Sequence, residues 1–211
     1  MTERFDEEFW DERYRAHPAL WSGNPNPHLV GEAAGLAPGA ALDVGCGEGA
    51  DAIWLAERGW QVTAVDLSTV ALGRAAGHAA RAGAEIAARI DWQHGDITAA
   101  TWDPGTARYD LVCAQYLHLP AGPREALFRR LAGAVRSGGT LLIVGHHPLD
   151  LQTTMPRPPQ PELFFTGDDV AALLDPAAWK VITNAAAPHP ATDPEGRTVT
   201  IHDAVLRARR P

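Results

Sequence analysis

The side chains best placed to hold a ligand lie in residues 42–49, where Gly45, Gly47 and Gly49 alternate with other residues after a short apolar run. Glycines between a strand and a helix permit a sharp turn and let a ligand lie against the backbone with no Cβ in the way. The pattern therefore predicts a nucleotide-like ligand on this turn. Gly45, Gly47 and Ala50 also satisfy a loose dinucleotide fingerprint, so the glycines alone do not identify the nucleotide.

Two carboxylates next to this turn narrow the choice of ligand. Asp43 comes just before the glycines, where its negative charge disfavours a pyrophosphate but suits the ammonium group of a methionine moiety. Asp66 follows about 20 residues after the glycines, where a carboxylate can accept hydrogen bonds from ribose hydroxyls. Asp43 therefore favours S-adenosylmethionine over NAD, whereas Asp66 fits both cofactors. A simple helix-capping role is the alternative for Asp66.

Residues 42–72 resemble motif I and the following strand of the class I S-adenosylmethionine-dependent methyltransferases. The resemblance continues in order through residues 94–97, 109–112, 130–131 and 138–143. It implies methyl transfer from S-adenosylmethionine on a Rossmann-like fold. The implied cofactor contacts are Asp43, Gly45 and Gly47 on the methionine side, Asp66 and Leu67 at the ribose, Asp96 and Ile97 at the adenine, and Gln115 nearby. For Asp96, a plain turn residue is the alternative.

Residues 9–14 and 21–25 are similar to the N-terminal segment of small methyltransferases that alkylate soft nucleophiles, including the tellurite-resistance and the thiopurine or halide types. In such relatives this segment folds over the cofactor. The similarity implies that Arg13, Tyr14 and Trp21 lie near the methyl group. Packing between helices is the alternative for the two aromatic side chains.

Three histidines and Tyr14 are the candidate catalytic side chains. Methyl transfer is an in-line displacement, so a general base is useful only for acceptors such as phenols, alcohols or protonated amines. His118 follows the fourth predicted strand, and His146 and His147 follow the fifth, at the strand ends where open α/β sheets place ligands. Neighbouring strand residues point to opposite faces, so at most one of His146 and His147 is expected to face the pocket.

Other chemistries find less support in the sequence. Cys46 is not expected to act as a nucleophile, because methyl transfer from a sulfonium needs no covalent enzyme intermediate. Cys46 and Cys113 are the only cysteines and are expected to be reduced thiols. No HExxH motif or close Cys/His spacing predicts a metal site. A catalytically silent S-adenosylmethionine-binding module and, less favoured, an NAD-dependent oxidoreductase stay open as alternatives.

Apolar runs alternate with segments rich in alanine, leucine and arginine across the middle of the chain. The apolar runs predict buried parallel strands at residues 40–44, 61–65, 109–114 and 140–145, with a weaker one at residues 89–93. The intervening segments predict helices at residues 50–58, 69–82 and 122–135. This alternation indicates a mostly parallel α/β sheet with helices on both faces.

The two ends of the chain flank this core. Helices are expected at residues 3–16 and 28–36, and the prolines between residues 148 and 161 predict a long irregular loop that could act as a lid. Residues 166–169 resemble a capping box for a short helix to residue 174. Final strands at residues 179–186 and 198–206 are expected to pair antiparallel, which completes a seven-stranded sheet.

We therefore expect a single methyltransferase domain over residues 1–211. Its parts are an N-terminal helical cap segment (1–38), a cofactor-binding core (39–145) and a C-terminal part with the lid loop, helix and strand pair (146–211).

The composition of the chain indicates which kinds of partner it can bind. The net charge of −8 disfavours a nucleic-acid partner and favours a small-molecule acceptor. No apolar run approaches the roughly 20 residues of a membrane helix, and the acidic start is unlike a secretory signal. A cytoplasmic protein without a membrane partner is expected, and composition does not indicate an oligomeric state.

Overall fold

Seven strands form one mixed sheet in the computed structural model, which describes residues 5–211. The strand order is β3-β2-β1-β4-β5-β7-β6. Strands β1 to β5 run parallel, and β7 runs antiparallel to both β5 and β6. The mostly parallel sheet with a C-terminal antiparallel pair is thus confirmed. The strands are β1 (Ala40–Val44), β2 (Gln61–Asp66), β3 (Ile90–His94), β4 (Tyr109–Gln115), β5 (Val135–His146), β6 (Lys180–Thr192) and β7 (Thr198–Arg209).

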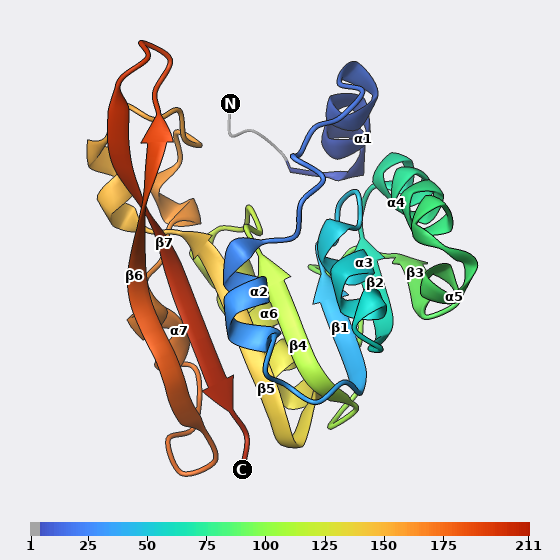
Figure 1. The fold of residues 1–211 in the computed structure, drawn as a ribbon. Coiled ribbons are helices and arrows are strands. Elements are labelled where there is room, and N and C mark those ends of the chain that lie inside the picture. Colours follow the sequence, from blue (N-terminus) through green and yellow to red (C-terminus); the bar gives the residue numbers. More distant parts are fainter. Residues whose placement is uncertain (1–4) are drawn as a thin grey trace.

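Helices cover both faces of the sheet (Figure 1). One face carries α2 (Pro27–Ala33), α3 (Ala50–Glu57) and α4 (Thr69–Ala82), and the other carries α6 (Ala121–Ala134) and α7 (Gly167–Ala171). Helix α1 (Glu7–Ala16) lies beyond the carboxyl ends of the parallel strands, on α4. The remaining helices are α5 (Ala84–Ala87) and the 3₁₀ helices η1 (Pro148–Gln152) and η2 (Pro161–Leu163).

Strand β5 shows how the sequence builds two cores on one sheet. Its residues alternate between faces, so Leu141 and Ile143 pack with the α6 side while Leu142 and Val144 pack with the α2 and α3 side. All four side chains are buried. A strand that is apolar on both faces is what a parallel sheet with two helical layers requires.

The central strands end level with one another, and this places the candidate residues together. In the sheet register Val44 of β1 lies opposite Val65 of β2 and Ala114 of β4. The residues that follow these positions are Gly45, Asp66 and Gln115. The carboxyl edge of the sheet therefore gathers the glycine turn, the predicted ribose contact and the predicted cofactor neighbour.

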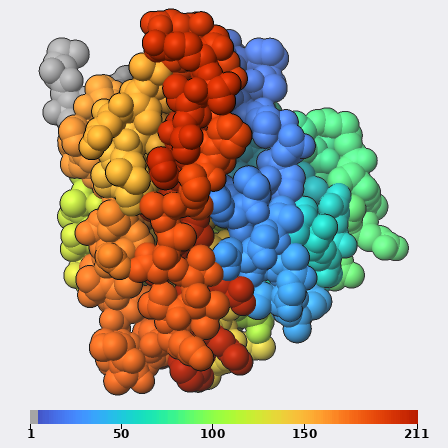
Figure 2. Space-filling model, turned by 60° about the vertical axis from the view of Figure 1, so that its left-hand side comes forward, coloured from blue at the N-terminus to red at the C-terminus, as the bar shows by residue number. Residues whose placement is uncertain are grey.

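The C-terminal hairpin packs beside the N-terminal part of the chain, which Figure 2 shows as red and orange atoms next to blue ones. Glu32 of α2 accepts a hydrogen bond from Thr183 of β6 at 2.9 Å and forms an ion pair with Arg207 of β7 at 3.4 Å. His28 Nε2 of α2 lies 3.0 Å from Asp203 Oδ2 of β7. Across residues 5–211, no helix has both the length and the apolar character needed to cross a membrane.

Most predicted elements are present with shifted ends, and one prediction about proline was wrong. The predicted N-terminal helix begins at Glu7, and residues 1–4 lie outside the described residues. Thr166 and Asp169 form the predicted capping box. The proline-rich loop is not wholly irregular, because η1 and η2 begin with prolines, which the first turn of a helix tolerates. Strand β6 runs on through Pro188 and Pro190, since it lies at the sheet edge.

Candidate active site

The glycine turn adopts a backbone that only glycine takes up easily. Gly45, Gly47 and Gly49 have φ angles of +73°, +53° and +85°. The N–H groups of Gly45 and Cys46 donate to the carbonyl oxygen of Val65 at 2.8 and 3.1 Å, which ties the turn to the end of β2. A Cβ on Gly45 would lie 2.4 Å from Leu117 Cδ2. The sequence places glycine where the turn and its close neighbours require it.

Three carboxylates surround this turn. Asp66 Oδ2 accepts the N–H of Gly47 at 2.8 Å, and Asp51 Oδ1 accepts the N–H of Asn26 at 2.6 Å. Asp43 is fully buried, and its Oδ2 has no hydrogen-bond partner. Burial raises the pKa of all three carboxyls, that of Asp51 to about 6, and the charges of Asp51 and Asp66 raise the pKa of Asp43 further. The site is therefore poised to accept a cationic group.

Residues 7–26 of the N-terminal cap segment cover the turn from outside the sheet. Tyr14 is buried, and its hydroxyl accepts a hydrogen bond from Trp21 Nε1 at 3.0 Å. A Cβ on Gly47 would lie 3.0 Å from that hydroxyl. Both aromatic side chains thus lie against the glycine turn. Burial raises the pKa of Tyr14, so at neutral pH its phenol is protonated and cannot serve as a base.

The other predicted cofactor residues line the same edge of the sheet with their backbones engaged. Asp96 is exposed, and its Oδ1 accepts the N–H and hydroxyl of Thr98 at 2.8 and 2.6 Å, as a turn residue would. The carbonyl of Ile97 accepts from Arg130, and that of Leu67 accepts from His94.

Gln115 and Arg13 lie on opposite sides of the space between the sheet and the cap segment. Gln115 ends β4, and its buried Nε2 has no hydrogen-bond partner. Arg13 lies on α1, where its side chain is exposed to solvent. Burial and, to a smaller extent, the positive charge of Arg13 lower the pKa of His118.

The structure brings two of the three candidate histidines together. The rings of His118 and His146 lie 6.1 Å apart, and the ring of Tyr116 lies 4.8 Å from that of His146. Trp10 of the cap segment lies 5.5 Å from His118, and Phe164 lies 5.9 Å from His146. Burial lowers the pKa of both histidines, that of His146 to about 4. Both are neutral at pH 7, as a general base must be.

His147 lies apart from this aromatic cluster. Its Nδ1 accepts the N–H of Leu149 at 3.2 Å and so caps η1, and its ring lies 6.4 Å from that of His202. The alternation of side chains along β5 turns His146 and His147 to opposite sides. Of the two, only His146 contacts Tyr116 and lies near His118.

Asp51 is a site residue that the sequence analysis did not single out, whereas Tyr116 is expected from the sequence to shape the acceptor pocket, but without its backbone angle. Tyr116 follows β4 with a φ of +51°, which is strained for a tyrosine, and this backbone turns its ring toward His146. No sequence pattern reveals such an angle. Asp51, directly after the glycine turn, could have been found as the third acid in residues 43–51. Within residues 5–211, no group of three or more potential ligand side chains is arranged to hold a metal ion.

Replacing His146 with glutamine is expected to flatten the pH dependence of stability in mild acid. The unfolded chain binds a proton to this histidine below pH 6.5, whereas the folded chain resists protonation down to about pH 4. Stability is therefore lost as the pH falls between these values. Between pH 7 and pH 5 the wild type should lose about 2 kcal/mol more than His146→Gln in urea unfolding. Equal losses would mean that the ring is accessible to water.

The comparisons with known proteins agree with this geometry. A family model described as a methyltransferase domain matches residues 41–139, which contain the glycine turn and all three carboxylates. An uncharacterized methyltransferase of Mycobacterium bovis is 42% identical over 104 residues, which are 49% of this chain and 48% of that protein. Residues 41–139 therefore form a methyltransferase domain of the class I S-adenosylmethionine-dependent type. Members of this family use S-adenosylmethionine as methyl donor, and the NAD-dependent alternative is left without support.

The relatives that this chain matches are named for different methyl acceptors. A 2-heptyl-1-hydroxyquinolin-4(1H)-one methyltransferase of Mycobacteroides abscessus is 27% identical over 171 residues, which are 76% of this chain and 74% of that protein. The chain spans about half the length of the first curated relatives it matches.

Solved structures extend the similarity over nearly the whole of this chain. A structure from a study of the conversion of a disulfide bond into a thioacetal group during echinomycin biosynthesis has a TM-score of 0.72 and 26% identity, with 97% of this chain and 91% of that chain covered. TehB from Haemophilus influenzae has a TM-score of 0.70 and 18% identity, with 97% and 67% covered. The likeness to TehB supports the predicted fold.

Proposed function

We propose that this chain transfers a methyl group from S-adenosylmethionine to a small-molecule acceptor. The observation that carries the proposal is the buried Asp43, whose Oδ2 has no partner although Asp51 and Asp66 add further negative charge around it. A buried carboxylate without a partner is costly, so such a group is kept where a ligand completes it. The ammonium of a methionine moiety has the required charge and donors.

The protein's own residues would divide the work between binding and alignment. The bound cofactor supplies a methyl carbon activated by positive sulfur. Asp43 would hold its ammonium group and Asp66 its ribose hydroxyls, while Gly45 and Gly47 leave room for it along the backbone. Asp66 can do this while bonded to the N–H of Gly47, because each carboxylate oxygen accepts more than one hydrogen bond.

The cap segment would exclude water from the reacting atoms. Tyr14 and Trp21 lie over the glycine turn. Tyr14 is buried against Gly47, and its hydroxyl accepts a hydrogen bond from Trp21 Nε1. Water exclusion and alignment are the main tasks in a displacement at an activated carbon. Leu67, Asp96, Ile97 and Gln115 remain proposed neighbours of the ribose and adenine, and Arg13 a proposed neighbour of the acceptor.

The aromatic cluster of Trp10, Tyr116, His118, His146 and Phe164 supports a small acceptor with an apolar ring. Its histidines are neutral at pH 7, so His146 or His118 can accept a proton from an acceptor that must lose one. His147 is a weaker candidate, because its Nδ1 already accepts a backbone N–H. Some relatives are named for ribosomal RNA, but a net charge of −8 opposes binding to phosphate backbones.

Calorimetry with S-adenosylhomocysteine tests the proposal. Wild-type protein should bind it, and Asp66→Ala should bind at least about tenfold more weakly, because hydrogen bonds from ribose to a charged acceptor are lost. Asp175→Ala is the matched control, since Asp175 makes the same type of turn bond to Ala177 but lies exposed at a distance. No binding by the wild type would refute the proposal.

Turnover separates an enzyme from a silent binding module. Wild-type protein that binds S-adenosylmethionine should release S-adenosylhomocysteine when supplied with a thiol, a phenol or a hydroxylated heterocycle. Binding without product from any of these classes would favour the silent module.

A further inference from the structure

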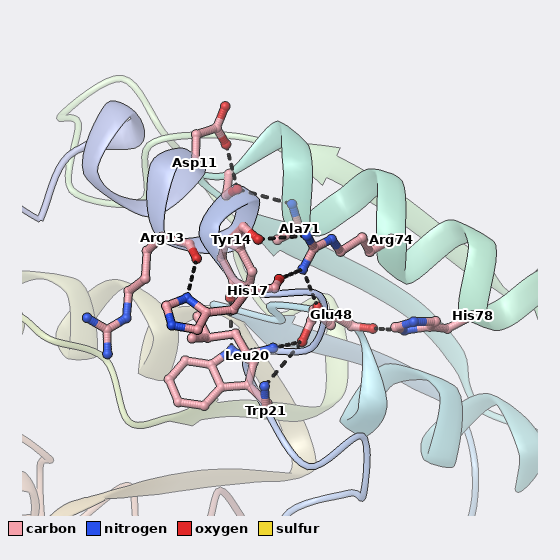
Figure 3. Close-up of polar contacts among 11 residues, drawn as sticks. Asp11, Arg13, Tyr14, His17, Leu20, Trp21, Glu48, Ala71, Arg74 and His78 are labelled. Atoms are coloured by element: carbon pink, nitrogen blue, oxygen red, sulfur yellow. Dashed lines mark hydrogen bonds and ion pairs between the residues drawn. The ribbon is translucent and has the colours of Figure 1, made fainter.

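Glu48 is a buried acid of the glycine turn whose partners all lie outside the turn (Figure 3). Its Oε2 accepts the N–H groups of Leu20 and Trp21 at 3.2 and 3.3 Å. Its Oε1 forms an ion pair with Arg74 Nη1 at 2.9 Å. One carboxylate thus joins the turn to the cap segment and to helix α4.

Arg74 closes the connection from the other side. Its Nη1 also donates to the carbonyl of His17 at 2.8 Å, and its Nη2 donates to the carbonyl of Tyr14 at 2.6 Å. These carbonyls lie at the end of α1, where a cation is favourable, and the carbonyl of Tyr14 also accepts the N–H of His17 at 3.3 Å. The guanidinium fork therefore holds the end of α1 and the carboxylate of Glu48 at once.

A second anchor holds the start of the cap segment. Asp11 Oδ1 accepts the hydroxyl of Ser68 at 2.6 Å and the N–H of Val70 at 3.3 Å, at the N-terminus of α4. Ser68 in turn donates its N–H to Asp66 Oδ1 at 2.9 Å. Asp11 thereby fixes α1 against the residues that follow the proposed ribose contact.

Tyr14 and Trp21 lie between these two anchors, directly over Gly47. Trp21 has an exposed side chain, yet its backbone N–H is bound by the buried Glu48. Loss of the pair would remove the side-chain partners of the N–H groups of Leu20 and Trp21 and of the carbonyls of Tyr14 and His17. The cover over the glycine turn would then lose its hold between Asp11 and Asn26, whose N–H is bound by Asp51.

We propose that Glu48 and Arg74 are positioning residues that latch the cap segment over the cofactor site, so that cofactor affinity depends on a pair that does not touch the cofactor. This inference rests on the proposed function. Closing the cap segment and binding the cofactor are then coupled, and each must favour the other by the same factor. If the pair only stabilised the fold, its removal would lower the unfolding temperature without changing this coupling.

The test compares Arg74→Met, which keeps the side chain's length but none of its donors, with Arg81→Met on the exposed side of α4. Arg74→Met should weaken S-adenosylhomocysteine binding at least about tenfold in calorimetry, whereas Arg81→Met should bind as the wild type does. Arg74→Lys, which keeps the charge but lacks the fork, should fall between them.

Trypsin reports the cap segment directly, because Arg13 and Arg15 lie on its exposed face. S-adenosylhomocysteine should slow cleavage after these residues in the wild type and in Arg81→Met, but much less in Arg74→Met. Protection that is the same in all three proteins, or unchanged affinity in Arg74→Met, would overturn the inference.

Two further outcomes are distinguishable. Where Arg74→Met is unfolded at the assay temperature, Glu48→Gln takes its place, because it keeps the side-chain volume and removes the ion pair. Wild-type affinity in a folded Glu48→Gln would overturn the inference. A wild type that binds no S-adenosylhomocysteine would instead refute the proposed function on which the inference rests.

Discussion

Replacing Asp43 with asparagine is expected to stabilise the protein while weakening cofactor binding. The carboxylate is fully buried, and burial together with the charges of Asp51 and Asp66 raises its pKa well above its usual range. Asparagine keeps the shape and removes the charge. Free energies of unfolding from urea titration at pH 8 should rise by about 2 kcal/mol. Affinity for S-adenosylhomocysteine should fall on the order of 100-fold, because a buried charge partner of its ammonium is lost.

The free energy of unfolding of the wild type and that of Asp43→Asn should depend differently on pH. Because the folded-state pKa of Asp43 lies above its unfolded value, the folded chain holds this proton more tightly, and the wild type gains stability as the pH falls toward 3.8. Asp43→Asn should lack that gain. Asp103→Asn, an exposed turn aspartate, is the control and should match the wild type in both measurements. A less stable Asp43→Asn would show that the buried oxygen has a partner in the folded protein.

The core of the fold could be predicted because local pattern and tertiary role coincide there. Residues 40–44 and 69–82 appear as β1 and α4 with the predicted ends, since apolar strands and capped helices mark their own limits. Proline was misleading after β5, where η1 and η2 begin with prolines. Pro188 and Pro190 do not end β6, because an edge strand can present its unpaired side to solvent, and the sequence does not reveal which strand is the edge.

Residues of the candidate site could be predicted where chemistry follows the chain, and not where it follows packing. Asp43 and Asp66 lie at strand ends, so their meeting at the glycine turn follows from a parallel sheet. The partnership of Glu48 with Arg74 depends on how α1 docks on α4, and residues so far apart in the chain show no common pattern. The angle at Tyr116 depends likewise on its neighbours in the folded protein.

Replacing Gly45 with alanine is expected to cost about 3 kcal/mol of unfolding free energy and to abolish cofactor binding. Alanine at a φ of +73° costs about 1–2 kcal/mol, and its Cβ would lie 2.4 Å from Leu117 Cδ2, an overlap that adds about 1–3 kcal/mol. Leu117 joins Tyr116 to His118, so its displacement would also disturb the aromatic cluster. Urea unfolding measures the first effect and calorimetry with S-adenosylhomocysteine the second.

A second substitution separates the two causes. In Gly45→Ala/Leu117→Ala the overlap is relieved while the backbone angle still disfavours alanine, so the double variant should be more stable than the sum of the single effects by about 1–3 kcal/mol. Cofactor binding should not return with stability, because the new Cβ still occupies the turn where the ligand would lie. Strict additivity would show that Leu117 yields without cost, and restored binding would show that the ligand does not approach the backbone at Gly45.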